Sequence, residues 1–121
     1  MIGLLKALFG RAGERIDVQG ALRRIDAGAI LLDVREADEY AGGHAPSALS
    51  LPLSQLRAHG NAAIDRLGLS EKTTDILLIC QSGMRSRMAQ SILSADTRRR
   101  YINVTGGMAT WAARGLPLSQ K

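Results

Sequence analysis

The chain has 121 residues, 45% hydrophobic but only 3% aromatic, which suits one globular domain with an aliphatic core. Its 16 basic and 11 acidic residues give a formal net charge of +5. Nucleic acid is a poor partner for this basic chain, because aromatic stacking residues are scarce and no recognition motif is present. A single cysteine excludes an internal disulfide, and two distant histidines, His44 and His59, do not indicate a metal site.

The chain begins with a short apolar segment, residues 1–10, which Lys6 interrupts. A membrane span needs about 20 apolar residues, so we expect no integral membrane segment. No cleavage site of a signal peptide follows it, and we expect a cytoplasmic protein. Residues 1–13 are predicted to form a short apolar helix or extension that packs on the domain, binds a partner or lies weakly on a membrane surface. The domain itself is expected over residues 14–118, and residues 119–121 are expected to form a tail.

The first half of the chain alternates helical and strand-like segments. Asp17 is suited to cap a helix over residues 18–27, with Leu22 and Ile25 on its inner side. Residues 29–34 form a continuous apolar run, which is typical of a buried parallel strand. Residues 36–41 predict a short helix that Gly42 and Gly43 end, followed by a loop over residues 44–47 and another strand over residues 48–51.

The second half repeats this alternation. Residues 53–67 predict one or two helices broken near Gly60, and residues 73–80 contain the most apolar strand. A helix over about 85–95 carries four apolar residues at helical spacing, which we predict to face the core: Met84, Met88, Ile92 and Ala95. A strand over residues 101–104 and a helix over residues 108–114, with Trp111 packed inward, complete the chain. Such alternation predicts a parallel sheet covered by helices on both faces.

Cys80 lies at the carboxyl end of the most apolar predicted strand, the edge at which open α/β sheets bind ligands. Free backbone N–H groups, the positive end of the next helix and Arg85 all favour the thiolate form of a cysteine in this position. The alternative is a small buried hydrophobe, a common state of free cysteine. The residues that follow Cys80 favour the reactive thiol.

The loop after Cys80 is built to surround a negative charge. Its candidate binding residues are Gln81, Ser82, Gly83, Met84, Arg85 and Ser86. A ring of this length directs successive N–H groups inward, and glycine tolerates the backbone angles that the curl requires. The two serine hydroxyls donate hydrogen bonds, and the guanidinium of Arg85 suits an oxyanion. The predicted ligand is either the sulfur bound to a thiolate or a tetrahedral oxyanion such as sulfate, thiosulfate or phosphate.

The sequence resembles the single-domain rhodanese-like sulfurtransferases in four separate segments. Residues 32–36 (LDVRE) are similar to the first motif of that family, and residues 39–48 (EYAGGHAPSA) to the second. Residues 80–86 (CQSGMRS) resemble its catalytic loop. The terminal segment is matched by Gly106, Gly107, Trp111, Gly115 and Pro117. The resemblance implies a single α/β domain whose central parallel sheet has about five strands.

The resemblance also implies a two-step transfer of sulfur. Cys80 would attack the outer sulfur of a small anionic donor, thiosulfate or a persulfide, and form a persulfide of its own. A thiophilic acceptor would then remove that sulfur: cyanide, a thiol or a sulfur-carrier protein. Neither a metal nor an organic cofactor is implied.

Other functions remain open at this point. A non-enzymatic sulfur-carrier or interaction module would use the same loop to recognise a partner, although inactive relatives usually lose the cysteine. The related phosphatases and arsenate reductases have one more residue between cysteine and arginine, whereas four residues separate Cys80 from Arg85. Gln81 stands where many members that use thiosulfate have a basic residue, which weakens the case for thiosulfate.

Three further residues are candidates for supporting roles. Asp33 ends a predicted strand, where its carboxylate is placed to accept N–H bonds from the Cys80 loop. Arg35 either forms an ion pair or faces the substrate. His44 is a candidate base, but the transfer needs none, so a hydrogen bond that orients a loop is the favoured role.

Overall fold

A computed structural model describes residues 13–121, which form a five-stranded, entirely parallel sheet in the order β1-β5-β4-β2-β3. The strands are β1 (Arg15–Ile16), β2 (Ile30–Asp33), β3 (Leu49–Ser50), β4 (Asp75–Ile79) and β5 (Arg100–Val104). The predicted α/β class, with helices on both faces of a parallel sheet, is therefore confirmed. The expected N-terminal helix or extension lies, apart from Gly13, outside the described residues.

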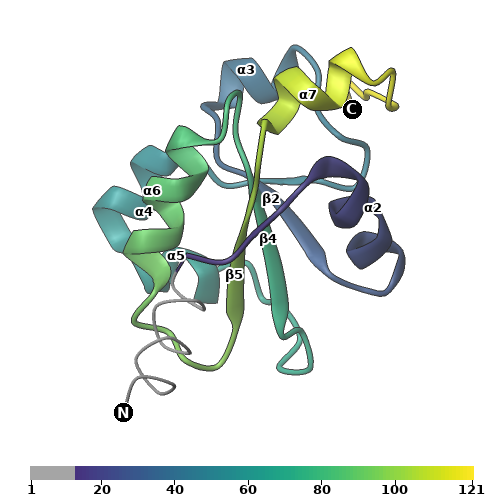
Figure 1. The fold of residues 1–121 in the computed structure, drawn as a ribbon. Coiled ribbons are helices and arrows are strands. Elements are labelled where there is room, and N and C mark those ends of the chain that lie inside the picture. The colour runs from purple at the N-terminus through teal and green to yellow at the C-terminus, as the bar shows by residue number, and fades with distance from the viewer. Residues whose placement is uncertain (1–12) are drawn as a thin grey trace.

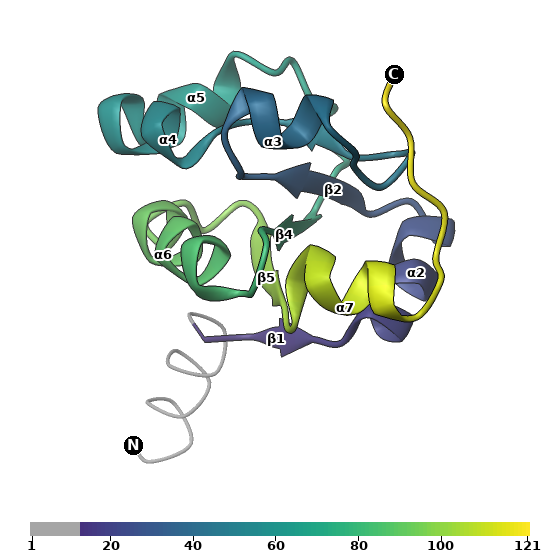
Figure 2. The same cartoon turned by 90° about the horizontal axis from the view of Figure 1, so that it is seen from above.

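Helices cover both faces of the sheet (Figures 1 and 2). One face carries α2 (Val18–Asp26) and α7 (Gly107–Ala113), and the other carries α4 (Leu53–His59), α5 (Asn61–Asp65) and α6 (Met84–Leu93). The short helix α3 (Ala37–Ala41) lies at the end of the molecule to which the strands point. Within residues 13–121, no helix combines the length and the hydrophobicity that a membrane crossing requires.

The alternation of side chains along β4 divides the core into two clusters. Ile76 and Leu78 pack with the residues of α4, α5 and α6, whereas Leu77 and Ile79 pack with those of α2 and α7. All four are fully buried, which explains why the strand is an unbroken apolar run. Cys80 continues the alternation and belongs to the cluster on the α6 side. The register of β4 therefore decides which way the thiol points.

The predicted boundaries differ from the observed ones by at most two residues. Asp17 caps α2 as predicted, since its carboxylate accepts a hydrogen bond of 2.7 Å from the N–H of Gly20. The helical segment 53–67 is indeed broken at Gly60, where φ is +56°. Strand β1 was not predicted, because a two-residue strand gives no alternating pattern. It is held at the edge of the sheet by parallel pairing with β5.

The predicted core stripe on the helix after Cys80 is largely wrong, since only Ile92 packs against the core and Ala95 is exposed. Met84 is 74% exposed and Met88 is 43% exposed. The buried side of α6 instead consists of Ser86, Ala89, Gln90 and Leu93. Two of these are polar and hydrogen-bonded: the amide of Gln90 donates to the carbonyls of Glu14 and Tyr101 at 2.6 and 2.7 Å, and the hydroxyl of Ser86 bonds the side chain of Asn103. Hydrophobic spacing alone selected the wrong face, because this helix buries hydrogen-bonded side chains.

Helix α7 begins against the end of β4, and the contact needs a glycine. The N–H groups of Met108 and Ala109 donate to the carbonyls of Cys80 and Gln81 at 2.8 and 3.0 Å. Gly107 has φ of +56°, and a Cβ atom there would lie 2.3 Å from the carbonyl oxygen of Cys80. The neighbour is backbone, which cannot rotate away. The turn over Gly106 and Gly107 thus lets the free N–H groups of α7 bind the Cys80 loop.

We predict that Gly107→Ala separates α7 from the Cys80 loop and lowers the free energy of unfolding by about 2 to 4 kcal/mol, because overpacking adds to the strain of a positive φ. Chemical denaturation measures the change. Gly68→Ala is the matched control, since Gly68 has φ of +66° and its added Cβ would meet nothing within 4 Å. Equal losses of unfolding free energy in both variants would show that backbone strain, and not the close approach to Cys80, explains why residue 107 is glycine.

Candidate active site

The thiol of Cys80 lies at the carboxyl end of β4, buried beneath the loop that follows it. Its side chain is 1% exposed. The N–H of Gly83 donates a hydrogen bond to Sγ at 3.0 Å, and the hydroxyl oxygen of Ser86 lies 3.4 Å from Sγ. The sulfur atom is therefore held in a polar cup at the end of an otherwise apolar strand.

These contacts change the acidity of the thiol. Burial raises the pKa of Cys80, but hydrogen bonds from the Ser86 hydroxyl and from the N–H groups of Ser86, Gly83 and Ser82 outweigh it, and the net pKa is lowered. A lowered pKa increases the thiolate fraction near neutral pH, and the thiolate is the nucleophilic form. The cup thus favours a reactive cysteine over an inert buried one.

The predicted loop residues do surround Cys80, but not in one layer. Gly83 caps α6 with φ of +106°, a left-handed conformation that turns its N–H toward the sulfur. Ser86 is buried beneath the loop, whereas Gln81, Ser82 and Met84 are exposed on its outer side. The outer three residues are therefore the part of the loop that is most open to solvent.

Arg85 is engaged by a carboxylate that sequence reasoning did not single out. Its two terminal nitrogens donate to the two oxygens of Glu39, on α3, at 2.7 and 2.9 Å. The bond to Arg85 is the main reason that the pKa of Glu39 falls to about 2, so the pair is fully ionised at neutral pH. The guanidinium of Arg85 is predicted to suit an oxyanion, but in the structure Glu39 already shares its charge. Glu39 lies in the EYAGGHAPSA segment, but its pairing with Arg85 depends on how α3 folds over the loop.

Asn103 is a second residue that sequence reasoning missed. It lies on β5 with 7% of its surface exposed, and its amide oxygen is 2.5 Å from the hydroxyl of Ser86. Its amide nitrogen donates to the carbonyl of Gly83 at 3.3 Å. Asn103 therefore joins the two residues that contact Sγ from beneath. A polar residue inside the apolar run of residues 101–104 was the available signal.

Asp33 and Arg35 form a buried ion pair beside the loop. Arg35 donates to both carboxylate oxygens of Asp33, at 2.7 Å for the shortest bond, and to the carbonyl of Gly43 at 2.7 Å. The expectation that Asp33 accepts N–H bonds from the Cys80 loop is wrong; its backbone donor is the N–H of Arg35. The pair instead fixes the end of β2 against the loop after α3.

His44 lies in this same loop and makes structural contacts. Its Nδ1 atom is 2.7 Å from the carbonyl of Tyr40, and its ring stacks on the ring of Tyr40 with centroids 3.6 Å apart. Its backbone pairs with Ser119, which ties the end of the chain to this loop. These contacts match the loop-orienting role that we favoured for His44.

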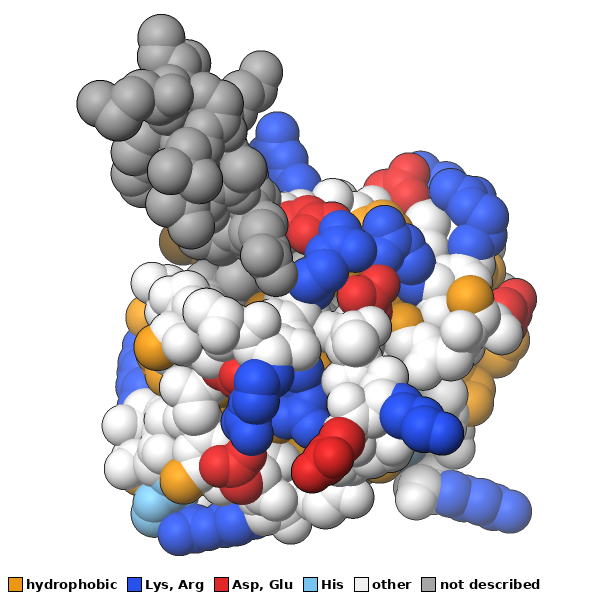
Figure 3. All heavy atoms as spheres, turned by 90° about the horizontal axis from the view of Figure 1, so that it is seen from below, with side chains coloured by type: hydrophobic (Ala, Val, Ile, Leu, Met, Phe, Trp, Pro, Cys, Tyr) orange, Lys and Arg blue, Asp and Glu red, His pale blue; other side chains and the backbone are white. Residues whose placement is uncertain are grey.

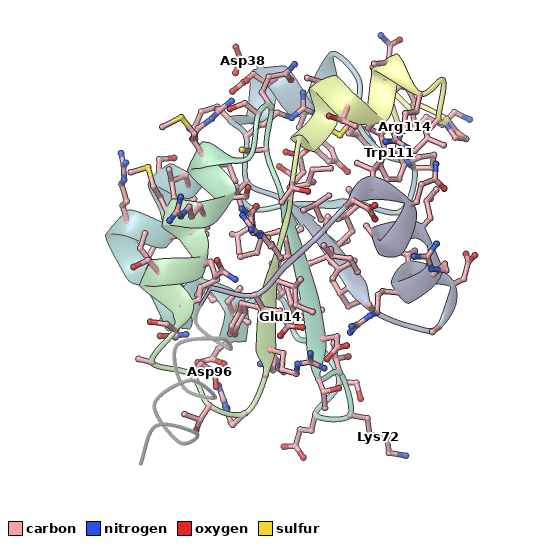
Figure 4. The ribbon with its side chains drawn as sticks, in the orientation of Figure 1. Glu14, Asp38, Lys72, Asp96, Trp111 and Arg114 are labelled. Atoms are coloured by element: carbon pink, nitrogen blue, oxygen red, sulfur yellow. The ribbon has the colours of Figure 1, made fainter. Side chains whose placement is uncertain are left out.

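A shallow cleft of about 370 Å³ opens beside the Cys80 loop, and α3 and α7 form its two walls. Its lining consists of Arg35, Asp38, Glu39, Gly42, Gly43, Gln81, Met108, Ala112 and Leu118. Figure 4 shows Asp38 extending from α3 at the end of the molecule to which the strands point. Within the described residues, no group of three or more His, Cys, Asp or Glu side chains is placed to hold a metal ion.

Comparison with known proteins matches this chain to one family model and to several relatives. The model of the rhodanese-like domain matches residues 17–114. A sulfurtransferase of Allochromatium vinosum is 34% identical over 89 residues, which cover 74% of this chain and 77% of that protein. The putative sulfur carrier protein YrkF of Bacillus subtilis is 30% identical over 101 residues, covering 82% of this chain. This chain spans about half of YrkF, 51% of its length.

Solved structures agree with the sequence comparison. A rhodanese-related protein from Thermoplasma volcanium has a TM-score of 0.73 at 27% identity, and the match covers 89% of this chain and 99% of that one. The family match spans most of the chain and includes β2, the Cys80 loop and α7. The chain belongs to the rhodanese-like domain family.

Proposed function

We propose that this protein is a sulfurtransferase that carries sulfane sulfur as a persulfide on Cys80. The observation that supports this most directly is the polar cup around Sγ, in which the N–H of Gly83 donates at 3.0 Å and the thiol pKa is lowered. A nucleophilic sulfur and an N–H cradle for the charge that develops on it are the two requirements of the reaction. A free reactive thiol also fits a reducing compartment such as the cytoplasm.

The proposed reaction has two balanced steps. The thiolate of Cys80 attacks the outer sulfur of the donor, a new S–S bond forms, and the rest of the donor leaves with the electron pair, as sulfite when the donor is thiosulfate. An acceptor nucleophile then attacks the same outer sulfur, and Cys80 leaves as the thiolate. The loop N–H groups stabilise the anion before and after each step.

The Arg85–Glu39 pair bears on which donor the site accepts. A dianion such as thiosulfate gains most from an unshared cation, but here Glu39 neutralises Arg85 and the neighbouring loop residue, Gln81, is uncharged. Asp38 adds a further negative charge to the same cleft. We therefore infer that thiosulfate, a compact dianion, reacts less well than low-molecular-weight persulfides, which carry at most one negative charge on their sulfur atoms.

We predict that Cys80→Ser abolishes sulfur loading. Intact mass of the wild-type protein after incubation with thiosulfate, glutathione persulfide or polysulfide is expected to show one added sulfur, which cyanide removes. The Ser variant is expected to show none, because a hydroxyl at that place is neither ionised nor able to form a persulfide. If the wild-type protein gains no sulfur from any of the three donors, the proposed function is wrong.

We predict that Ser86→Ala raises the pKa of the Cys80 thiol, because the variant removes the hydroxyl that stabilises the thiolate. The pH dependence of alkylation by iodoacetamide gives the midpoint, which is expected below the ordinary cysteine value in the wild type and higher in the variant. Ser82→Ala serves as the control, since Ser82 acts through its backbone N–H, which alanine retains. An equal shift in both variants would rule out the assigned role of the Ser86 hydroxyl.

We predict that Glu39→Gln raises kcat/KM for thiosulfate about three- to tenfold relative to glutathione persulfide, because it releases the charge of Arg85. A nearby surface charge is worth about 1 kcal/mol, which corresponds to about fivefold. Asp38→Asn removes an equal charge from the same cleft, where no ion pair involves Asp38 among the described residues, and is expected to change the ratio less. An unchanged ratio in Glu39→Gln would contradict the inferred donor preference.

A further inference from the structure

The helices beside the Cys80 loop expose an apolar and cationic surface. Met84, Arg87 and Met88 project from α6, and Arg57 projects from α4. Arg57 and Met88 are in contact, with 3.8 Å between the guanidinium nitrogen Nη2 and the sulfur Sδ. We call these four residues the Met-Arg face. Its two methionines are 74% and 43% exposed, although they lie at helical spacing that would suit a core.

The Met-Arg face is cationic because nothing acidic accompanies it on its helices. Neither α4 nor α6 contains an aspartate or a glutamate. Among the described residues, neither Arg57 nor Arg87 forms an ion pair. The end of the molecule away from the Cys80 loop differs, since acidic and basic side chains are interspersed there (Figure 3). At that end Arg100, the first residue of β5, forms an ion pair with Glu14.

The composition of this face is that of a protein interface. Methionine and arginine are enriched at protein–protein interfaces, whereas aspartate and glutamate are depleted. An exposed methionine adapts its flexible side chain to different partners. The fold does not require these methionines, because the buried side of α6 is filled by Ser86, Ala89, Gln90 and Leu93.

The position of the face relates it to the thiol. Met84 directly follows Gly83, whose N–H contacts the sulfur of Cys80, and α6 extends away from that point beside α4 (Figure 1). A molecule that covers the Met-Arg face therefore also borders the mouth of the site. We propose that the Met-Arg face docks an acidic protein surface that presents the acceptor thiol for the Cys80 persulfide. This inference rests on the proposed sulfurtransferase function.

Charge favours a separate acidic partner over three other occupants of the face: the N-terminal residues of this chain, a second copy and a lipid surface. Residues 1–12 of the chain contain Lys6 and Arg11 and no acidic residue, so their sequence offers no charge complementary to Arg57 and Arg87. The Met-Arg face of a second copy carries the same charge. An anionic lipid surface matches the charge, but it offers no nucleophile to Cys80, whereas removal of the sulfur requires an acceptor nucleophile such as a thiol.

The docked thiol completes the reaction without another reagent. The acceptor thiolate attacks the outer sulfur of the Cys80 persulfide, the bond to Cys80 breaks, and the acceptor leaves as a persulfide. Cys80 regains the electron pair as the thiolate. No electrons are lost or gained overall.

Single-turnover transfer to two cysteine peptides tests the proposal. Both have the same length and leucine neighbours, but one is flanked by glutamates and the other by lysines. The persulfide-loaded protein is mixed with each peptide, and intact mass follows the loss of the sulfur. We expect the acidic peptide to react at least tenfold faster at low salt, with the advantage shrinking as ionic strength rises. Equal rates for the two peptides would overturn the proposal.

Charge reversal locates the docking surface. Arg57→Glu/Arg87→Glu is expected to remove the preference for the acidic peptide and to leave sulfur transfer to cyanide unchanged. The matched control is Arg23→Glu/Arg114→Glu, which makes the same charge change at exposed positions on α2 and at the end of α7 and is expected to keep the preference. Loss of the preference in both double variants would show an effect of net charge and overturn the assignment. Met88→Ser is expected to slow the acidic peptide severalfold.

The remaining outcomes distinguish failure of the docking surface from failure of the proposed sulfurtransferase function. Failure to load any sulfur would refute the sulfurtransferase itself, whereas normal loading and cyanide transfer without peptide discrimination would refute only the docking surface. Pelleting with vesicles of anionic phospholipid that depends on Arg57 and Arg87 would assign the face to a membrane. Sedimentation that shows a dimer dependent on the same two residues would assign it to a second copy.

Discussion

Two hydrogen bonds between helix α7 and the Cys80 loop fix the site on which the chemistry depends. The N–H groups of Met108 and Ala109 bind the carbonyls of Cys80 and Gln81, which turns those carbonyls away from the sulfur. The C=O and N–H of one peptide plane point in opposite directions. The N–H groups that share a peptide plane with these two carbonyls therefore point toward the side of the sulfur. Gly107 permits this approach, since any side chain there would strike the Cys80 carbonyl.

The polar network beneath the loop makes that arrangement stable inside an apolar core. Ser86 touches the thiol and bonds Asn103, which also holds the carbonyl of Gly83. A buried polar group without a partner would cost roughly 1 to 3 kcal/mol, so such a network has to be complete to be tolerated. Every buried side-chain nitrogen and oxygen in residues 13–121 has a partner. The thiol thus gains hydrogen bonds that lower its pKa even though burial opposes its ionisation.

The arginines near the site differ in role, because within residues 13–121 some are paired with a carboxylate and others are not. Arg85 is bound by Glu39 and leaves little free charge at the mouth of the thiol. Among the described residues, no carboxylate forms an ion pair with Arg57 or Arg87, and both lie beside exposed methionines. The same residue type therefore serves to moderate the site in one place and, in our proposal, to attract a partner in the other.

The sequence by itself determined the fold class, the position of Cys80 and the loop around it, because local spacing and apolar runs carry that information. It also identified the glycines at residues 106 and 107, although not the carbonyl that they accommodate. Only the tertiary structure decided that Glu39 takes the charge of Arg85 and that Asn103 supports Ser86, since these pairs join segments far apart in the chain. It likewise decided that Met84 and Met88 face outward, because α6 turns its hydrogen-bonding residues toward the sheet. Periodicity places side chains on one face of a helix, but only packing determines which face is buried.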